Sequence, residues 1–253
     1  MSFAQNFKLK TTSMKKLVLA FMGMAFFSAV NAQHSFGIHA NGIMSNYSGE
    51  YKDGNVTIKQ DGKYKASWKA GVAANLLLVD NFVFMPQLNL LSKGTKIKES
   101  GTETIGGFPV TYKLDGKGDY TYLELPLYFM YSSNGELGGF FAGLGPVFSY
   151  GLSGKEKVTT TVNFGGGSET ETSDNKVKFD GKKDANDEFS HYNAFEFGGG
   201  LIAGYKTASG LFVNAHYHHG FSNISPDTDS KLKNKYFGVG IGYFFGGGAT
   251  MKK

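Results

Sequence analysis

The sequence predicts an all-β protein, an eight-stranded antiparallel up-and-down transmembrane β-barrel. Segments of about ten residues alternate bulky apolar side chains with small or polar ones, which is the period of a β-strand. The connections between these segments alternate between long and short, as in bacterial outer-membrane barrels. The chain of 253 residues also has 36 glycines and 15% aromatic residues, which suits strands and turns better than helices.

The last segment, residues 236–245, shows most clearly which face of a strand points outward. It reads Y-F-G-V-G-I-G-Y-F-F, so bulky apolar side chains share one face and glycines share the other. In a soluble barrel the bulky side chains would fill the inside, but glycines cannot fill a core. We therefore expect the bulky face to contact lipid. A soluble lipocalin-type barrel, which has the opposite orientation, is the main structural alternative.

The first four predicted strands show the same alternation. The first sets Ile38 against His39, and the second, the most regular, sets Trp68 against Lys69. The third alternates in the same way, and the fourth places Glu124 opposite a face of leucines. These strands span residues 36–44, 64–78, 82–93 and 122–131.

The other four predicted strands complete the barrel. The fifth has glycines on its inner face, with Phe141 as a bulky exception. The sixth turns Glu196 inward, and the seventh turns His216 and His218 inward. The eighth should close the ring against the first, with both termini on the periplasmic side. These strands span residues 139–150, 192–205, 211–218 and 236–245.

Polar segments of very different length connect these strands. The short turns are residues 79–81, 132–135 and 206–210, and the long loops are residues 45–63, 94–118, 153–190 and 220–235. The longest, 153–190, has two extended arms around the glycines at 165–167. We assign no apolar face to either arm and therefore expect a hairpin that projects into solvent.

The N-terminus has the layout of a secretory signal peptide. Met14, Lys15 and Lys16 precede an apolar run, and Ala32 precedes a plausible cleavage point before Gln33. We therefore divide the chain into an N-terminal extension and cleaved signal peptide (1–32), an outer-membrane barrel (33–245) and a short periplasmic tail (246–253). Four of the 26 basic residues precede Gln33, which leaves 22 against 21 acidic residues, so the formal charge of +5 belongs largely to the leader. An uncleaved anchor is the alternative.

The composition excludes several kinds of site. Cysteine is absent, so the chain has no disulfide and no thiolate metal site. Arginine is absent too, which removes the usual bidentate reader of phosphates and bases, so we expect no nucleic-acid partner. The run His216 to His219 offers only two histidines on one strand face. If Tyr205 pairs with Leu211 across the turn, Gly198 lies opposite His218 and no carboxylate supplies a third ligand, so we expect no metal. We expect no cofactor and no catalytic residue.

Charged and histidine side chains on inward faces form the first candidate site. An eight-stranded barrel is just wide enough for side chains to fill it, and buried charges must be paired. We expect a lumen polar network that closes the barrel, and a proton or ion path is the alternative. Its members are Lys69, Lys93, Glu124, Glu196, His216 and His218.

Aromatic residues near strand ends form the second candidate site, a lipid-facing girdle. Such rings lie at both interfaces of membrane barrels, so outer-membrane lipid is the expected partner of this surface. The girdle residues are Trp68, Phe82, Tyr131, Phe140, Tyr150, Tyr205, Tyr217, Phe237, Tyr243 and Phe245.

Several pieces of the chain resemble a known family. Y-L-E-L-P-L (122–127), F-A-G-L-G-P (141–146), F-G-G-G-L-I-A-G (197–204) and F-G-V-G-I-G-Y-F-F (237–245) are similar to the small outer-membrane β-barrels of Bacteroidetes that are called porin family or PorT-like. This resemblance implies a location in the bacterial outer membrane, an eight-stranded barrel akin to OmpX or the OmpA membrane domain, and no catalytic residues. The aromatic end, Tyr243 to Phe245, resembles the C-terminal signal read by the barrel-assembly machinery. The tail beyond it departs from the family.

These observations favour a non-enzymatic barrel with a largely filled lumen, which supports the envelope or binds an outside partner through the loop 153–190. A small passive-diffusion porin is the first alternative. A hydrolase or acyltransferase at the rim is the second, and an accessory of a secretion or gliding apparatus is the third, by analogy alone. The rim enzyme would pair His191 with Asp184, Asp187 or Ser190, or His219 with Ser222.

Overall fold

The computed structural model describes residues 34–53, 56–134, 138–183 and 188–245. The predicted leader and the predicted tail lie outside these residues. Within the described residues, no helix is long and apolar enough to cross a bilayer. The strands are β1 (His34–Asp53), β2 (Val56–Asp61), β3 (Lys65–Val79), β4 (Phe82–Ile105), β5 (Phe108–Ser132), β6 (Gly139–Phe164), β7 (Gly167–Lys178), β8 (Phe189–His191), β9 (Phe195–Lys206), β10 (Leu211–Gly220) and β11 (Ser230–Phe245).

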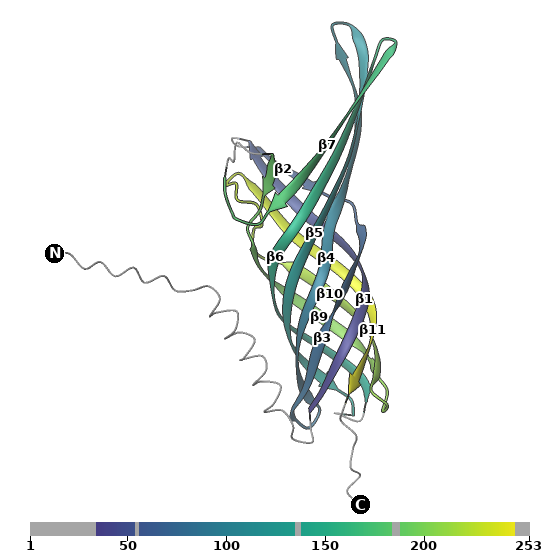
Figure 1. The fold of residues 1–253 in the computed structure, drawn as a ribbon, viewed down its shortest axis with the longest axis vertical. Coiled ribbons are helices and arrows are strands. Elements are labelled where there is room, and N and C mark those ends of the chain that lie inside the picture. Colours follow the sequence, from purple (N-terminus) through teal and green to yellow (C-terminus); the bar gives the residue numbers. More distant parts are fainter. Residues whose placement is uncertain (1–33, 54–55, 135–137, 184–187, 246–253) are drawn as a thin grey trace, which may run out of the picture.

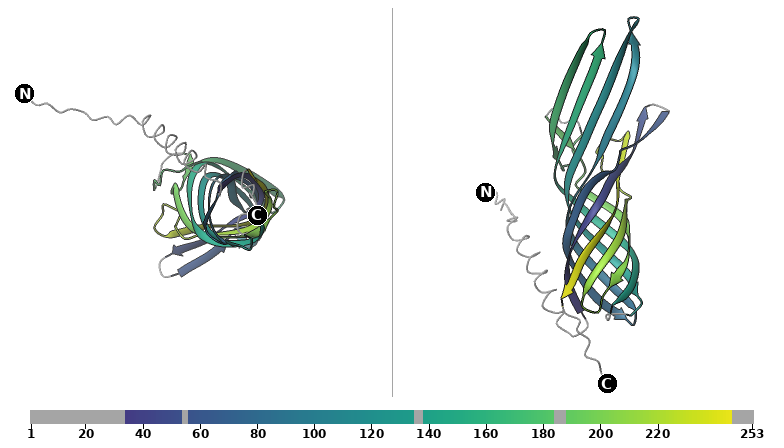
Figure 2. Two further views of the ribbon diagram at one scale, coloured as in Figure 1. Left: turned by 90° about the horizontal axis from the view of Figure 1, so that it is seen from below. Right: turned by 90° about the vertical axis from the view of Figure 1, so that its right-hand side faces the viewer.

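Eight of these strands form a closed antiparallel ring. Its order is β1, β3, β4, β5, β6, β9, β10 and β11. Each strand of the ring pairs with the ring strand that follows it in sequence, so the predicted up-and-down barrel is confirmed (Figures 1 and 2). The last strand closes on the first, as predicted, with Phe36 opposite Phe245 at one end of the seam and Tyr51 opposite Ser230 at the other. A closed ring leaves no unpaired sheet edge along the barrel wall.

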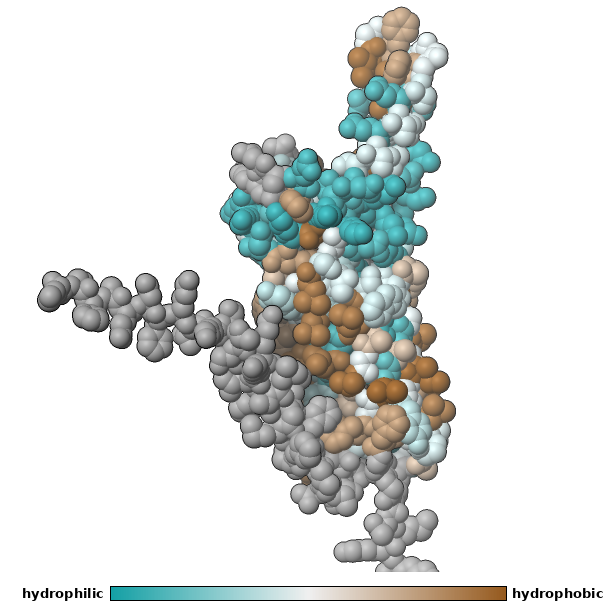
Figure 3. Space-filling model, in the orientation of Figure 1, coloured by the Kyte–Doolittle hydropathy of each residue, from teal (hydrophilic) through white to brown (hydrophobic). Residues whose placement is uncertain are grey.

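Side chains alternate across the barrel wall as the sequence predicts. On β11, Val239 and Ile241 are exposed on the outside, whereas Tyr236 and Phe244 are buried in the lumen. The other ring strands show the same alternation, and their exposed apolar residues form a broad belt on the barrel, one side of which Figure 3 shows. Such a belt on the outside of a closed sheet is what a membrane barrel presents to lipid.

All four predicted long loops are wrong in part, because strands continue through them; β11, for example, already begins at Ser230, inside the predicted loop 220–235. The segment 45–63 holds the end of β1 and its hairpin partner β2. The segment 94–118 is a hairpin in which β4 and β5 pair without a break up to Ile105 opposite Phe108. On β5 the apolar alternation was present and overlooked, because Phe108, Val110, Tyr112 and Leu114 share one face. The other residues of these two segments are mostly polar and form strands because cross-strand backbone hydrogen bonds need no apolar face.

The segment 153–190 contains the predicted hairpin, formed by β6 and β7. It pairs with the β4–β5 hairpin, so the four strands form one sheet that rises far above the barrel (Figures 1 and 2). We call this sheet the blade and define it as residues 97–105, 108–116, 156–164 and 167–175. The prediction that neither arm has an apolar face is wrong, since Val158, Val162 and Phe164 share one face of β6.

The lumen is filled in layers. At the end with the short turns, an apolar cluster includes Met85, Phe141, Phe212 and Phe244. The cavity left beside this cluster has a volume of about 10 Å³, close to the minimum for a single water molecule. At the other end, Ile43, Leu91, Tyr122, Tyr236 and further aromatic residues form a second cluster. Buried polar side chains lie between these two layers.

Candidate functional site

Glu196 on β9 is the centre of the polar layer and is fully buried. Its carboxylate accepts hydrogen bonds from Lys93 Nζ at 2.9 Å and from Asn234 Nδ2 at 2.7 Å. The imidazole Nε2 of His218 lies 3.1 Å from the other carboxylate oxygen and donates to it, since an ionised carboxylate only accepts. A Cβ on Gly220 would approach this oxygen to 3.1 Å, so the glycine leaves room for it.

Glu124 on β5 is the second buried acid. The phenol of Tyr236 donates to it at 2.7 Å, and Ser149 donates at 3.4 Å. Lys69 Nζ lies 4.0 Å from the same carboxylate. The ring of Tyr236 stacks on His218 with centroids 4.9 Å apart, so the two acidic groups belong to one cluster of two glutamates and two lysines. The formal charges of these four side chains cancel, which is the condition for burying them.

The structure brings together the six predicted lumen residues: Lys69, Lys93, Glu124, Glu196, His216 and His218. His216 joins at the margin, where its ring meets Tyr236 edge-on at 5.8 Å between centroids and its Nδ1 shares a hydrogen bond with Asn214 at 3.0 Å. Sequence reasoning missed Tyr122, whose ring lies under Lys93 Nζ at 4.1 Å, and also missed Tyr236. Both tyrosines occupy inward positions of their strands. The alternation of inward and outward positions along each strand was the signal that could have identified them.

The predicted register between β9 and β10 is wrong by two residues. Tyr205 lies opposite Val213 instead of Leu211, and His218 lies opposite Gly200. A shift of two keeps every side chain on its face but changes its neighbours. No carboxylate lies directly opposite His218, as expected, yet Glu196 reaches it diagonally across the strands.

A second cluster covers the outer end of the lumen. The carboxylate of Glu156 accepts hydrogen bonds from Tyr120 at 2.6 Å, Tyr192 at 2.7 Å and Ser190 at 2.6 Å. Phe179 packs edge-on against Tyr122, with ring centroids 5.2 Å apart. Burial and the Glu156 charge raise the pKa of Tyr192 well above its usual value, so its phenol keeps the proton that it donates. Phe179, Ser190 and Tyr192 are thereby held over the outer end of the lumen.

The residues predicted for a rim enzyme do not form nucleophile–histidine pairs in the described structure. Ser190 donates to Glu156, and Ser222 donates to the carbonyl of Phe197 at 3.3 Å, so neither hydroxyl donates to a histidine. His191 Nδ1 lies 2.7 Å from Asp180, and this bond lowers the pKa of Asp180. The other two candidates, Asp184 and Asp187, lie outside the described residues. Among the residues described, no three acidic, histidine or cysteine side chains are placed to hold a metal ion.

The aromatic residues predicted for the girdle are all exposed on the outside of the barrel. Some contact one another across strands, as Phe82 does with Tyr131 and Phe140 does with Tyr205. Tyr64 belongs with them and was missed; its ring meets Phe237 at 5.3 Å between centroids.

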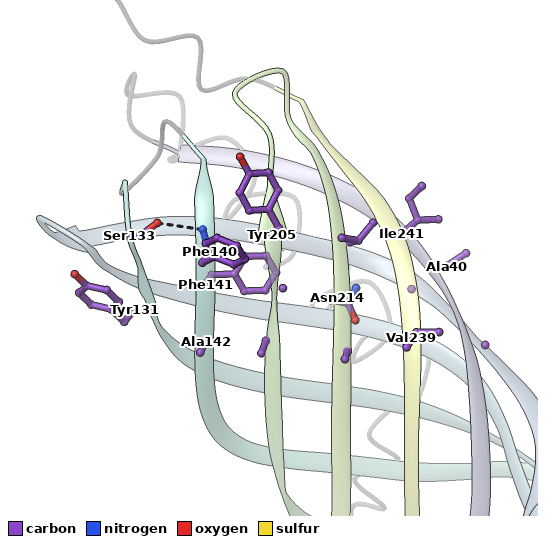
Figure 4. Close-up of a pocket in the computed structure, with 16 residues that line it drawn as sticks. Ala40, Tyr131, Ser133, Phe140, Phe141, Ala142, Tyr205, Asn214, Val239 and Ile241 are labelled. Carbon is purple, nitrogen blue, oxygen red and sulfur yellow. Dashed lines mark hydrogen bonds between the residues drawn. The ribbon is translucent and has the colours of Figure 1, made fainter.

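A shallow hollow lies in the apolar outer surface (Figure 4). Its floor includes Ala142, Ala203 and Ala215, which are paired in register on β6, β9 and β10. Phe140 and Tyr205 stand beside it, and its lining has no charged side chain. A hollow of this kind suits a hydrocarbon chain and offers nothing for catalysis.

Comparison with known proteins gives one family match. The family described as "Outer membrane protein beta-barrel domain" matches residues 3–225. No curated protein matches the chain. Among solved structures, the chain is similar to the attachment invasion locus protein Ail of Yersinia pestis, with 14% identity, 84% of this chain and 99% of that chain covered, and a TM-score of 0.38.

Two other solved structures show weaker likeness. Neisserial surface protein A has 11% identity, 83% and 97% coverage and a TM-score of 0.33. The toluene transporter TodX of Pseudomonas putida has 10% identity, 88% and 92% coverage and a TM-score of 0.30. Such low scores support no conclusion about the role of the chain.

Proposed function

Because the chain belongs to the outer membrane protein β-barrel domain family and so lies in the bacterial outer membrane, we propose that it is a non-conducting, non-enzymatic barrel that holds a binding surface outside the cell. The observation that carries this proposal is the contrast between a closed lumen and an extended blade. Two apolar clusters and the paired Lys93–Glu196 layer fill the barrel. The same strands then continue as the blade, which closing a barrel does not require.

The outside partner binds the blade, which includes much of the predicted contact segment 153–190. Four paired strands hold a surface in place better than a flexible loop, because each strand is fixed by its neighbours. Outer-membrane lipid covers the apolar belt, and acyl chains fill its hollow. The barrel-assembly machinery reads the aromatic end, Tyr243 to Phe245; full yields of folded barrel after depletion of that machinery would contradict this.

A variant with a shortened blade tests the binding role. An Asn-Gly turn replaces residues 99–114 and joins Lys98 to its paired residue Asp115; a second turn replaces 160–171 and joins Thr159 to Thr172. Labelled wild-type barrel should bind some spots on an array of purified extracellular proteins and glycans, and the shortened barrel should lose them. Heat-modifiable gel migration checks that both proteins fold. Identical patterns from the two proteins would refute a binding role of the blade.

Conductance separates the proposed function from a diffusion porin. Purified barrel added to a planar bilayer should give no reproducible conductance steps, because the paired side chains of Lys93, Glu196 and Tyr122 obstruct the lumen. Wild-type protein that opens stable channels would establish the porin instead. The narrower resemblance to PorT-like proteins, with a role in secretion or gliding, stays a prediction.

A further inference from the structure

The two faces of the blade differ in charge and polarity. On the outer face, lysines pair with aspartates: Lys98 with Asp115 at 3.5 Å and Lys157 with Asp174 at 4.0 Å. Threonines also bond across strands there, as Thr159 does with Thr172 at 3.1 Å. The inner face, which continues the lumen side of the wall, has no lysine in the range that defines the blade.

Apolar side chains form a stripe along the middle of the inner face. They lie on the two central strands, β5 and β6, and lead to an exposed apolar tip (Figure 3). Phe108 at the tip is 68% exposed, and Phe164 beside it is 47% exposed. The stripe consists of Phe108, Val110, Tyr112, Leu114, Val158, Val162 and Phe164.

Glutamates flank this stripe on both edge strands. One register row crosses the sheet from Glu99 through Leu114 and Thr160 to Glu171. In the next row towards the tip, Val162 lies opposite Glu169 on β7. Among the described residues, Glu103, Glu169 and Glu171 have no lysine partner. The β4 margin also places Ile97 and Ile105 on this face, at its two ends. The inner face is therefore an apolar track with glutamates along both margins.

The dimensions of the track decide what fits it. The margins are three strand spacings apart, or about 14 Å, which accommodates an α-helix of about 10–12 Å diameter with its flanking side chains. The stripe is roughly 20 Å long, the length of about 13 helical residues. A strand added to an open edge of β4 or β7 would leave the apolar side chains of the central strands uncovered.

We propose that the inner face of the blade binds a cationic amphipathic helix of an external polypeptide. Its apolar side would cover Tyr112, Leu114 and Val162, and lysines or arginines on its flanks would reach Glu103 and Glu171. Charge complementarity selects this partner, since an acidic or neutral helix would leave the glutamates unpaired beside apolar surface. This inference rests on the proposed binding role and adds the chemical class of the partner.

Peptide binding to the full barrel in zwitterionic nanodiscs tests the proposal. The probe is a labelled 14-residue helical peptide that has a stripe of leucines between lysines. Fluorescence anisotropy measures its binding. The shortened barrel gives the signal due to lipid alone. We expect saturable binding to wild type above this signal, and none by a peptide with glutamate in place of lysine or by a scrambled peptide of the same composition.

Matched variants locate the binding face. Glu103→Gln with Glu171→Gln should weaken peptide binding about fivefold to tenfold, the effect of two exposed ion pairs. Lys98→Gln with Lys157→Gln, an equal change on the outer face, should not weaken it. Equal affinity in both double variants, or equal binding of the scrambled peptide, would overturn the proposal.

The inner-face variant, together with alanine substitutions of Phe108 and Phe164, identifies a different occupant. Dimerisation seen by sedimentation and lost in the inner-face variant would assign this face to a second copy and overturn the proposal, as would binding of lipid vesicles that depends on Phe108 and Phe164. If the array pattern depends on the blade but the peptide does not bind, the partner class is wrong and the proposed function stands.

Discussion

Replacing Glu196 with alanine should lower the free energy of unfolding of the barrel by about 3–5 kcal/mol. The change leaves Lys93 buried without its partner at 2.9 Å, and it removes the acceptor of Asn234 and His218. An uncompensated charge in a buried layer costs far more than the lost pair contributed. Urea titration in detergent micelles, with the folded fraction followed by heat-modifiable gel migration, measures the change.

Two further variants identify the cause. Glu171→Ala removes an exposed acid of the blade and should change the free energy of unfolding by less than about 0.5 kcal/mol. The double variant Lys93→Met with Glu196→Leu removes both charges and should recover most of the loss, since apolar residues of similar volume often replace a buried pair without cost. A Glu196→Ala barrel as stable as Glu171→Ala would mean that water reaches this layer and that the lumen is not closed.

The inward position of each network residue could be predicted from sequence, because a strand alternates with a period of two. Which residues meet could not. Glu196 and His218 come into contact through the register of β9 and β10, and turn geometry sets that register. The sequence shows the turn at 206–210 but does not determine its conformation, so the predicted pairing was two residues away from the observed one.

The blade was partly hidden for a different reason. Its apolar stripe comes from β5 and β6. On the same face β4 alternates Ile97 and Ile105 with glutamates and a glycine, and β7 contributes glutamate, serine, asparagine and glycine. A strand such as β7 therefore has no apolar period of its own, and only its pairing with β6 makes it part of an apolar track. At Val158 and Val162 the alternation was present, but intervening threonines obscured it.

The second large expected effect comes from a substitution on the lipid-facing side of the barrel wall. Lysine in place of Ile241 should destabilise the barrel by about 2–4 kcal/mol, the cost of a cation facing lipid near the middle of the bilayer. Ile241 lies on the outer face of β11, between the girdle aromatics Phe237 and Tyr243. The same urea titration gives the magnitude, and refolding into bilayers of different thickness should change it.

Ile58 on β2 provides a matched control, because the exposed fractions of the two isoleucines are almost equal: 54% for Ile241 and 52% for Ile58. β2 pairs only with the far end of β1, outside the ring, where the side chain meets water. Ile58→Lys should therefore change the stability by less than about 0.5 kcal/mol. In a soluble barrel both positions would face water and both substitutions would be tolerated. A large difference between two isoleucines of equal exposure thus requires two different solvents, and an equal response would remove the argument that the bulky face of the last strand lies in lipid.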